Sequence, residues 1–393
     1  MKKIFKNRII WLCVLTASAF ILRFCFAEFL KNEHGVEWLK LLDIALILIA
    51  GAFFVLKEIA QVIEETTEIL SERTRIASGL LQSLGTAFPD MVLGIVAAIL
   101  SLRLVNEDYG AAINFAIIAA STTFGSNIYN IGHAIWCVFR QNVANKKGNE
   151  VMMVPFIKNL GQVLHMQDHK KKPSLKEIDA SLDILNVLTI LTGIVAISMV
   201  AFGRVTQPPE NISGDLYQLI RPVGVVILIL CALAMYFFRH TKRDNVLGEE
   251  LEREERYYAQ KPTWVILFYL LVSGIAILFA DEGMVIAVEE LCEITGLPFV
   301  VAGALAGIIG CIGEMIVVHN FTVNPKGRIG DALVGVAMDN IVTTMGASIV
   351  AVMGGIFLGG NSLILIFVII LSLNTALVWQ ISKLKNYFLA VQN

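Results

Sequence analysis

Apolar runs of about 20 residues recur along the whole chain, and they limit its possible folds more than any other feature. A helix of this length crosses the ~30 Å hydrocarbon core of a bilayer, because an α-helix rises about 1.5 Å per residue. The composition agrees, since 56% of the 393 residues are hydrophobic and only 16% are charged. The sequence therefore predicts an all-α polytopic membrane protein, embedded in a lipid bilayer.

The apolar runs predict about ten transmembrane helices. If the N-terminus is cytoplasmic, only six of the 31 lysine and arginine residues fall on the opposite side of the membrane. This positive-inside bias predicts that both termini face the cytoplasm. The predicted spans are residues 9–27, 41–60, 77–103, 111–139, 183–203, 217–238, 263–281, 297–318, 331–357 and 361–382. The six basic residues on the far side are Arg23, Lys31, Lys40, Arg103, Arg204 and Arg221.

The first predicted span, 9–27, has two interpretations. Its basic start, its short apolar stretch and the small residues Ala17 and Ala19 also fit a cleaved signal peptide. We expect a retained helix, and the orientation of the remaining spans is the same in either case.

Charge and cysteine patterns exclude other classes of function. The net charge is −2 and the basic residues are scattered over short connections, unlike the basic stripe of a nucleic-acid-binding protein. The six cysteines lack CxxC spacing, so neither a disulfide framework nor a zinc site is indicated. The polar stretches 141–180 and 241–260 are expected to be solvated cytoplasmic linkers.

An internal repeat relates residues 41–139 to residues 263–357. Each copy has an apolar helix with acids toward its end, a glycine-containing helix with one carboxylate well inside, and a helix rich in small polar residues. The predicted spans place the two copies in opposite orientations. Inverted repeats are typical of secondary transporters, whose ion sites lie at the repeat interface.

Two carboxylates, Asp90 and Glu314, are predicted near the middle of their spans. A carboxylate in a membrane helix is costly unless it faces a cavity, a partner or a bound cation, so both are candidate site residues. Pro89 lacks an amide and is expected to free a carbonyl about one turn earlier, near Thr86. Thr86 also shares a helix face with Asp90, which predicts a site for a hard cation.

The helix that follows Asp90 offers neutral oxygen ligands. Thr122, Ser126 and Asn130 recur at every fourth position and therefore lie on one helix face. His133 could extend this stripe as a proton-linked group, but we expect it to pack between helices.

The second copy adds a third acid, Asp339, which shares a helix face with Thr343. Three acids with several neutral oxygens suit calcium, which takes about six to eight oxygen ligands. Transition metals would need His or Cys ligands, which Cys311 and His319 indicate only weakly. The sequence thus favours calcium or sodium as the bound ion.

These residues resemble the calcium/cation antiporter superfamily, which includes the sodium/calcium exchangers. Each of that family's two α-repeats carries a Gly-Thr-Ser-x-Pro-acid helix followed by a Gly-Ser-Asn helix. Here GTAFPD (85–90) and GSNIYN (125–130) stand in that order on consecutive spans. The resemblance implies a ten-helix fold with a cytoplasmic loop between its halves. It also implies that Asp90, the Thr86 region, Ser126 and Asn130 line the ion site.

The second repeat departs from the family's pattern. Its sequence IGCIGE keeps Glu314 but has Gly310, Cys311 and Gly313 at the Thr, Ser and Pro positions. Gly310 is retained among the predicted site residues. The missing hydroxyl groups leave the driving ion open between sodium and protons. Only four spans follow the middle linker, where the family has five, and one hypothesis is that the span 9–27 fills the vacant position.

The expected organisation has four parts: an N-terminal helix (1–40), a first half (41–239), a linker (240–262) and a second half (263–393). The first half contains one α-repeat and a cytoplasmic loop, and the second half contains the other α-repeat. The repeats are residues 77–139 and 297–357, and the loop is residues 140–182.

The expected function is sodium/calcium antiport by alternating access, with no cofactor besides the transported ions. Exchange of calcium for protons is the first alternative, and an ion-binding sensor or channel that does not transport by exchange is another. The spans contain no HExxH, serine/histidine constellation or GxGD pair that would indicate an intramembrane enzyme.

Overall fold

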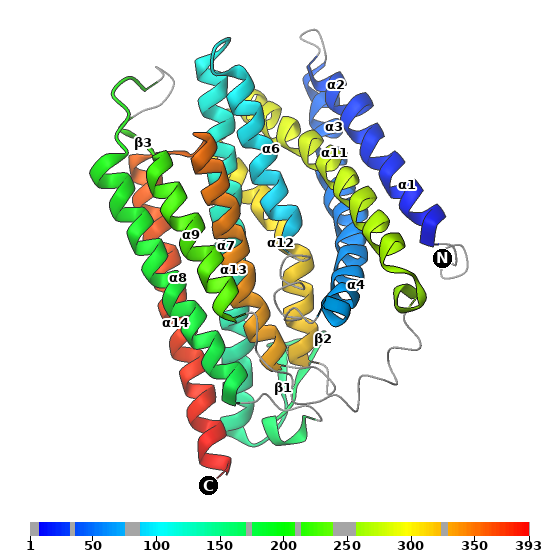
Figure 1. Ribbon diagram of the computed structural model, residues 1–393, viewed down its shortest axis with the longest axis vertical. Coiled ribbons are helices and arrows are strands. Elements are labelled where there is room, and N and C mark those ends of the chain that lie inside the picture. Colours follow the sequence, from blue (N-terminus) through cyan, green and yellow to red (C-terminus); the bar gives the residue numbers. More distant parts are fainter. Residues whose placement is uncertain are drawn as a thin grey trace.

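The computed structural model describes residues 8–31, 36–74, 87–169, 175–208, 214–238, 257–323 and 329–392. In this part of the chain, helices form ten continuous segments along the long axis of the molecule (Figure 1). The first segment is α1 (Arg8–Ile21), η2 (Leu22–Phe26) and α2 (Ala27–Leu30), and the second is α3 (Glu37–Ile49), η3 (Ala50–Leu56) and α4 (Lys57–Thr74). The others are α6 (Phe88–Leu104), α7 (Tyr109–Lys147), α8 (Leu175–Phe202), α9 (Arg221–Phe238), α11 (Thr263–Thr295), α12 (Phe299–Val323), α13 (Ile329–Met353) and α14 (Gly360–Gln392).

Each of the ten predicted spans overlaps one helical segment, although residues 77–86 of the third span lie outside the described residues. Seven segments contain a stretch long and apolar enough to cross a membrane, and shorter apolar helices lie in α6, α9 and α12. Successive segments run in opposite directions (Figure 1). Helices satisfy their own backbone hydrogen bonds, as a bilayer requires. The protein is therefore an all-helical, multi-pass integral membrane protein.

One predicted span, 263–281, is much too short, because α11 continues to Thr295. The acids that suggested an end to the span are compensated inside the protein. Arg23 Nη2 lies 2.7 Å from Glu282 Oε1, and Lys40 Nζ lies 2.7 Å from Glu290 Oε1. Such pairing lets charged side chains remain on a helix that packs against other membrane helices.

The expectation that residues 141–180 form a solvated linker is wrong for the part that the structure describes. α7 continues to Lys147, and β1 (Val151–Val154) and β2 (Ile157–Val163) form an antiparallel hairpin. Gln141 Nε2 donates a hydrogen bond of 2.9 Å to Leu164 O, so the connection is folded back onto the helix. Most of the other predicted linker, 241–260, lies outside the described residues, and its end forms the short helix η5 (Tyr257–Gln260).

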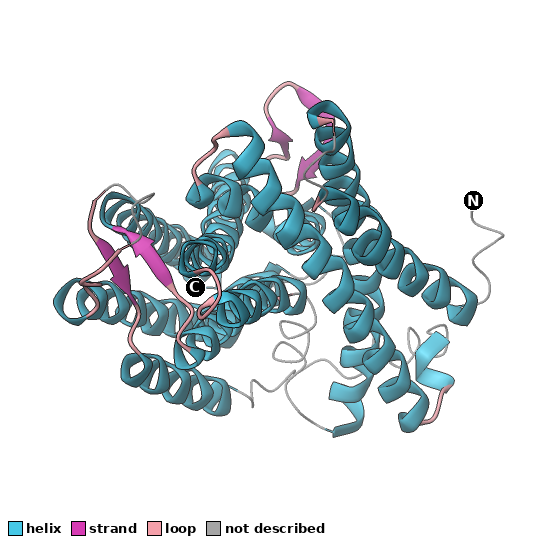
Figure 2. Ribbon diagram, turned by 90° about the horizontal axis from the view of Figure 1, so that it is seen from above, coloured by secondary structure: helices cyan, strands magenta, loops and turns pink. Residues whose placement is uncertain are grey.

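A second small sheet joins two other connections. β3 (Leu216–Gln218), between α8 and α9, pairs antiparallel with β4 (Phe357–Gly359), between α13 and α14. Both sheets lie at the periphery of the helices (Figure 2). The all-α prediction thus holds for the spans, and strands occur only in the connections of the described chain.

The helices fall into two groups (Figure 1). The α11 group consists of α11 with the segments α1–α2 and α3–α4, which pack against it. The α7 group consists of α6, α7, α8, α9, α12, α13 and α14. Within the α7 group, α7 is central, since 83% of its apolar stretch is buried, against 72% for α13 and 33% for α14.

The first span lies far from α14 and packs mainly on α11 of the second half, so the structure does not test directly whether it fills a vacant tenth position. α1 packs against α11 and η3, and Phe20 and Phe279 place their ring centroids 5.7 Å apart. α14 packs instead against α7 and α8, on the other side of the molecule (Figure 1). The first span is therefore an additional member of the α11 group.

Candidate cation site between the two repeats

The polar stripe predicted on α7 is buried inside the helical bundle. Thr122 and Ser126 are fully buried, and Asn130 is 4% exposed. Ser126 Oγ donates to Thr123 O at 3.0 Å, whereas Thr122 Oγ1 has no hydrogen-bond partner among the described residues. One face of α7 therefore presents hydroxyl and amide groups to the interior, as the four-residue spacing predicts.

Glu314 reaches this stripe from the second repeat. Its side chain on α12 is 2% exposed, and its Oε2 accepts a hydrogen bond from Asn130 Nδ2. These two residues are 184 positions apart in the sequence. The contact brings a carboxylate of one repeat against an amide of the other, deep among the helices.

A third helix, α13, contributes the remaining predicted residues. Asp339 is 5% exposed and Thr343 is fully buried. The Thr343 hydroxyl lies 3.0 Å from Asp339 O and 2.6 Å from Asn127 Oδ1, so these residues share a face and meet α7. Asn127 was not among the predicted residues, although the Gly-Ser-Asn motif contains it. It lies next to the four-residue stripe and connects α7 to α13.

Glycines let α7 and α12 approach closely enough for these contacts. A Cβ atom on Gly307 would lie 2.5 Å from Thr122 O and 2.8 Å from Ser126 N. On the other helix, a Cβ on Gly125 would lie 2.9 Å from the Cα of Ala304. Small residues at a membrane helix interface allow such backbone contact. The second repeat therefore places Glu314 about two helical turns beyond the glycine-based crossing at Gly307.

Asp90 lies at the start of α6, and residues 77–86 of its predicted span lie outside the described residues. α6 begins at Phe88 after Ala87, so Asp90 is in the first turn of this helix. Pro89 also lies in this first turn, where a missing amide breaks no helical hydrogen bond. The backbone position suits an anion, because the helix dipole is positive there. The Asp90 side chain and all of Thr86 lie outside the described part of the structure.

Gly310 lies on α12, one turn before Glu314, and is partly exposed. The described structure therefore brings together Glu314, Asn130, Ser126, Asp339 and Thr343 on three adjoining helices. Gly310 lies on one of these helices, and Asp90 lies at the start of α6, which packs against α7 and α13.

The α11 group contains two buried acids that the sequence did not single out as site residues. Asp281 of α11 is fully buried, and Asp43 of α3 is 8% exposed with its Oδ2 unbonded among the described residues. Asp281 belongs to a buried stripe with Ile277, Met284 and Val288, whereas the next residue, Glu282, turns toward Arg23. A charged residue inside an apolar helix was the sequence signal for a buried acid. Asp281 did not meet this criterion because the predicted span ended at position 281.

Histidine and cysteine side chains lie beyond Asn130 along the contact between α7 and α12, which we call the α7–α12 seam. The rings of His133 and His319 are stacked with centroids 6.0 Å apart, and Cys137 Sγ lies 3.5 Å from His133 Nε2. In the described part of the chain, no three His, Cys, Asp or Glu side chains form a group that could hold a metal ion. The arrangement supports helix packing by His133, as expected.

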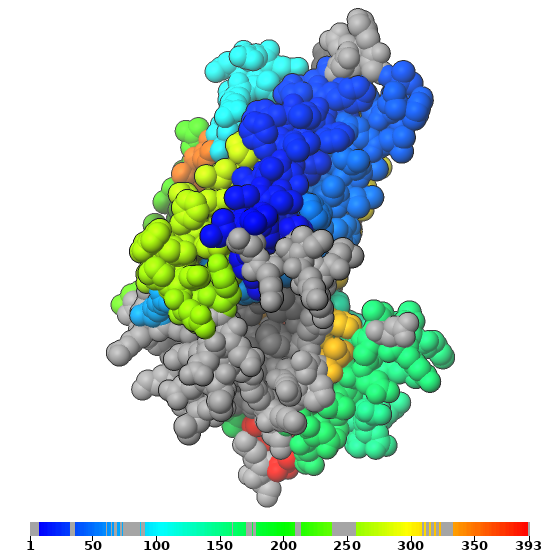
Figure 3. Space-filling model, turned by 90° about the vertical axis from the view of Figure 1, so that its right-hand side faces the viewer, coloured from blue at the N-terminus to red at the C-terminus, as the bar shows by residue number. Residues whose placement is uncertain are grey.

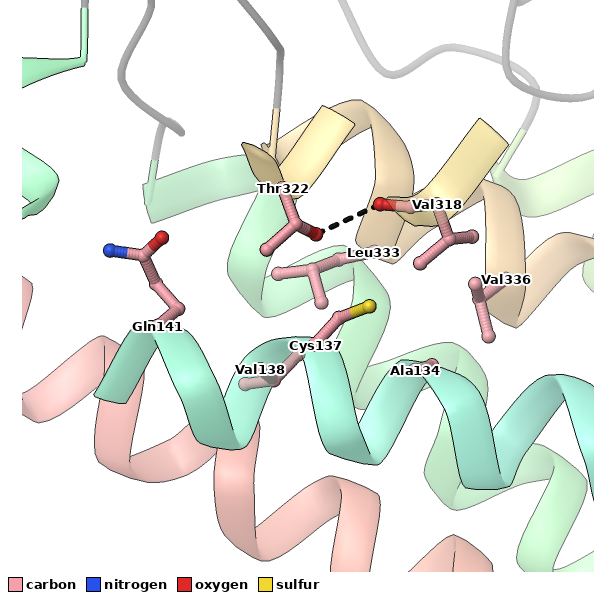
Figure 4. Close-up of a pocket in the computed structure, with 8 residues that line it drawn as sticks. All are labelled: Ala134, Cys137, Val138, Gln141, Val318, Thr322, Leu333 and Val336. Atoms are coloured by element: carbon pink, nitrogen blue, oxygen red, sulfur yellow. Dashed lines mark hydrogen bonds between the residues drawn. The ribbon is translucent and has the colours of Figure 1, made fainter. Parts of the chain in front are cut away.

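A small, mostly apolar pocket continues this seam (Figure 4). Its wall on α7 includes Ala134, Cys137 and Gln141, which follow Asn130 at helical spacing. From α12, the Thr322 hydroxyl donates to Val318 O at 2.8 Å at the pocket's edge. The lining is completed by Val138, Leu333 and Val336. The pocket lies between the polar cluster and the end of α7 that carries the β1–β2 hairpin.

Inverted helix repeats with buried acids and amides at their interface are typical of secondary transporters. Comparison with solved protein structures identifies the fold more specifically. The chain has the fold of the calcium/cation antiporters, as the similarity to the H+/Ca2+ exchanger CAX shows. That crystal structure has a TM-score of 0.54 at 13% identity, covering 97% of this chain and 98% of that chain.

The sodium-calcium exchanger NCX_Mj is also similar, at lower scores. Its structure after soaking with 2.5 mM Na+ and 10 mM Sr2+ has a TM-score of 0.45 at 14% identity, and the match covers 90% of this chain and 98% of that chain. No protein-family model and no curated protein sequence matches the chain.

Proposed function

We propose that the protein is a secondary active antiporter that exchanges calcium for sodium or protons across the membrane, without enzymatic chemistry. The observation that carries this proposal is the buried contact between Asn130 and Glu314, which joins the two repeats at one point. The proposed ion ligands are Asp90, Glu314, Thr86, Ser126, Asn130, Asp339, Thr343 and Gly310, to which Asn127 is added.

Calcium is favoured by the chemistry of these groups. Carboxylate, amide and hydroxyl oxygens are hard ligands, and calcium accepts many of them in an irregular shell. Glu314 and Asp339 supply negative charge, whereas Asn127, Asn130 and Thr343 supply neutral oxygens. Magnesium would keep much of its water and needs stricter octahedral geometry.

Alternating access would come from movement of the α11 group along the α7 group. Three ion pairs join the segments of the α11 group: Arg23–Glu282, Lys40–Glu290 and Arg8–Glu65. The first two have side chains that are 11–21% exposed, which favours movement of these helices as one unit. We propose α3–α4 and α11 as the pair of helical segments that slides, and the first span would therefore travel with them.

Competition for the same acids would couple the two ions. A carboxylate that loses calcium in an apolar site is stabilised by another cation or by a proton, because desolvation penalises the bare charge. We place sodium first, on the resemblance of the first repeat to the sodium/calcium exchangers. The absence of hydroxyl side chains at Gly310, Cys311 and Gly313 favours protons as the alternative.

Uptake of radioactive calcium into proteoliposomes tests this proposal. One set of vesicles carries an outward sodium gradient, and another carries an outward proton gradient without sodium. We expect uptake in at least one set and no uptake by the Glu314→Gln variant. Calcium uptake without any countertransported ion would instead support a channel, and calcium binding without uptake would support a sensor.

A further inference from the structure

The turn of the β1–β2 hairpin exposes an aromatic side chain at an unusual backbone position. Phe156 is 97% exposed, and its φ is 70°, the only positive φ of a non-glycine residue in the described chain. A bulky side chain in this region of backbone conformation is strained. Exposure of a large apolar surface to water adds a second cost at the same residue.

The hairpin lies level with aromatic and basic side chains of the membrane-spanning helices. Trp136 Nε1 donates to Met153 O at 3.1 Å, and Arg140 Nε donates to Met152 O at 3.0 Å, so β1 runs beside this turn of α7. The next residues of α7 connect to α14, where Asn142 Nδ2 donates to Gln380 O at 2.9 Å.

The residues next to Gln380 indicate where the apolar part of α14 ends. Trp379 is 57% exposed, and Lys383 Nζ lies 3.3 Å from the centroid of its ring. An exposed tryptophan paired with lysine is typical of the zone where lipid headgroups meet the hydrocarbon core. Since α7 contacts both the hairpin and this turn of α14, the hairpin is level with the Trp379–Lys383 pair.

The hairpin also extends sideways from the helices. In Figure 3 it forms a green lobe beside the orange atoms of α12. Ile157 and Leu160 are 47% and 43% exposed on the same hairpin, and Lys158 stands between them. Lys146 and Lys147 add positive charge at the end of α7, just before the hairpin.

We propose that the β1–β2 hairpin is a membrane-surface anchor that inserts Phe156 among lipid headgroups, and that Lys158 and the neighbouring Lys146 and Lys147 bind anionic lipids. An apolar tip with neighbouring basic residues is the pattern that recognises an anionic bilayer surface. Insertion removes Phe156 from water and compensates the strained turn. The inference concerns a surface outside the cation site and does not depend on the proposed transport activity.

The anchor connects directly to the helix that carries Glu314. The Leu160 carbonyl lies 2.8 Å from His319 Nε2 of α12, and a Cβ on Gly161 would lie 3.0 Å from Val323 Cβ. Lipid binding at the hairpin therefore stabilises one position of the end of α12. This contact provides a physical route from lipid composition to the cation site.

Fluorescence quenching in reconstituted vesicles tests the anchor. A Phe156→Trp variant adds emission to that of the five native tryptophans, and the unmodified protein provides the background. Phosphatidylcholine vesicles with and without phosphatidylglycerol carry lipids brominated near the headgroup end of the acyl chain. We expect these lipids to quench most of the added emission, and aqueous iodide to quench little of it.

Two further variants make the result specific. Gln167→Trp places the probe at an exposed position of the same connection, away from the tip, where iodide should quench it and brominated lipid should not. Adding Lys158→Gln to Phe156→Trp should reduce the lipid quenching when phosphatidylglycerol is present. Emission from position 156 that iodide quenches would overturn the proposal, as would emission protected from both quenchers, which indicates a covering protein.

Discussion

Glu314 and Asn130 form the contact on which the candidate site depends. Each is almost fully buried, and each comes from a different repeat. A carboxylate buried among membrane helices is costly unless it faces a partner or a bound cation. We interpret the contact between Glu314 and Asn130 as part of a cation site.

The first prediction concerns the two described acids of the site. Glu314→Gln removes the charge and keeps the volume, so calcium transport should be lost while the unfolding temperature stays the same or rises. Asp339→Asn should instead change the dependence of transport on sodium and protons. Transport assays and thermal unfolding in detergent measure both effects. Normal transport by Glu314→Gln would remove this residue from the ion pathway.

A second prediction concerns His169, which is 3% exposed in the connection between α7 and α8 and lies outside the membrane spans. Burial lowers the pKa of His169, so the folded protein keeps this imidazole neutral. The unfolded chain takes up the proton below about pH 6.5, and stability is therefore lost as the pH falls from there toward the lowered folded pKa.

The unfolding temperature should accordingly fall between about pH 7.5 and pH 5.5, and His169→Gln should weaken that dependence. Differential scanning fluorimetry in detergent over this range measures it, with His165→Gln as a control in the same connection. If His169→Gln leaves the slope unchanged, another group controls the acid sensitivity.

At the scale of elements, the crossing of α7 and α12 determines how near the repeats come. The predicted effect of Gly307→Ala is a loss of about 1–3 kcal/mol of stability, because the new methyl group meets backbone atoms that cannot yield easily. Gly132→Ala on α7 is the matched control, since nothing lies within 4 Å of its added Cβ. That variant should be neutral or slightly stabilising, because alanine favours helix.

Unfolding in denaturant compares these two glycine variants directly. Equal stability of Gly307→Ala and Gly132→Ala would mean that the helices do not approach as closely as the structure indicates.

The α11 group depends on ion pairs between helices. Lys40 and Glu290 are 11% and 16% exposed, so removing one partner leaves a poorly solvated charge. Lys40→Met should cost about 3–5 kcal/mol, and the exchange of both residues, Lys40→Glu with Glu290→Lys, should recover part of that loss. Thermal unfolding of the three proteins measures the coupling. A double variant no more stable than Lys40→Met would show that the pair does not join α3 to α11.

At the scale of the whole molecule, the direction of successive helices and the distribution of basic residues make a joint prediction. The ten helical segments of the described chain predict both termini on one side, and the positive-inside bias predicts that this side is cytoplasmic. A green fluorescent protein fused after Asn393 should therefore fluoresce in bacterial cells, whereas alkaline phosphatase fused at the same position should be inactive. The reverse pattern would invert the whole topology and place the hairpin outside.

The sequence by itself determined the membrane class, the ten helices and their alternation, because each follows from the length and apolarity of local runs. It also determined the helix faces of Thr122, Ser126 and Asn130, and of Asp339 and Thr343, because those faces depend only on helical periodicity. Glu314 was identifiable because a mid-membrane carboxylate is costly wherever it occurs.

Only the tertiary structure decided which of these faces meet. The contact between Asn130 and Glu314 depends on a glycine crossing of two helices that lie far apart in the sequence. The true length of α11, with Asp281 inside it, depends on the arginine and lysine side chains of other helices that pair with its glutamates. The place of the first span, and the docking of the β1–β2 hairpin on α7 and α12, were likewise hidden, because local periodicity carries no information about which distant surface compensates a charge or covers an apolar face.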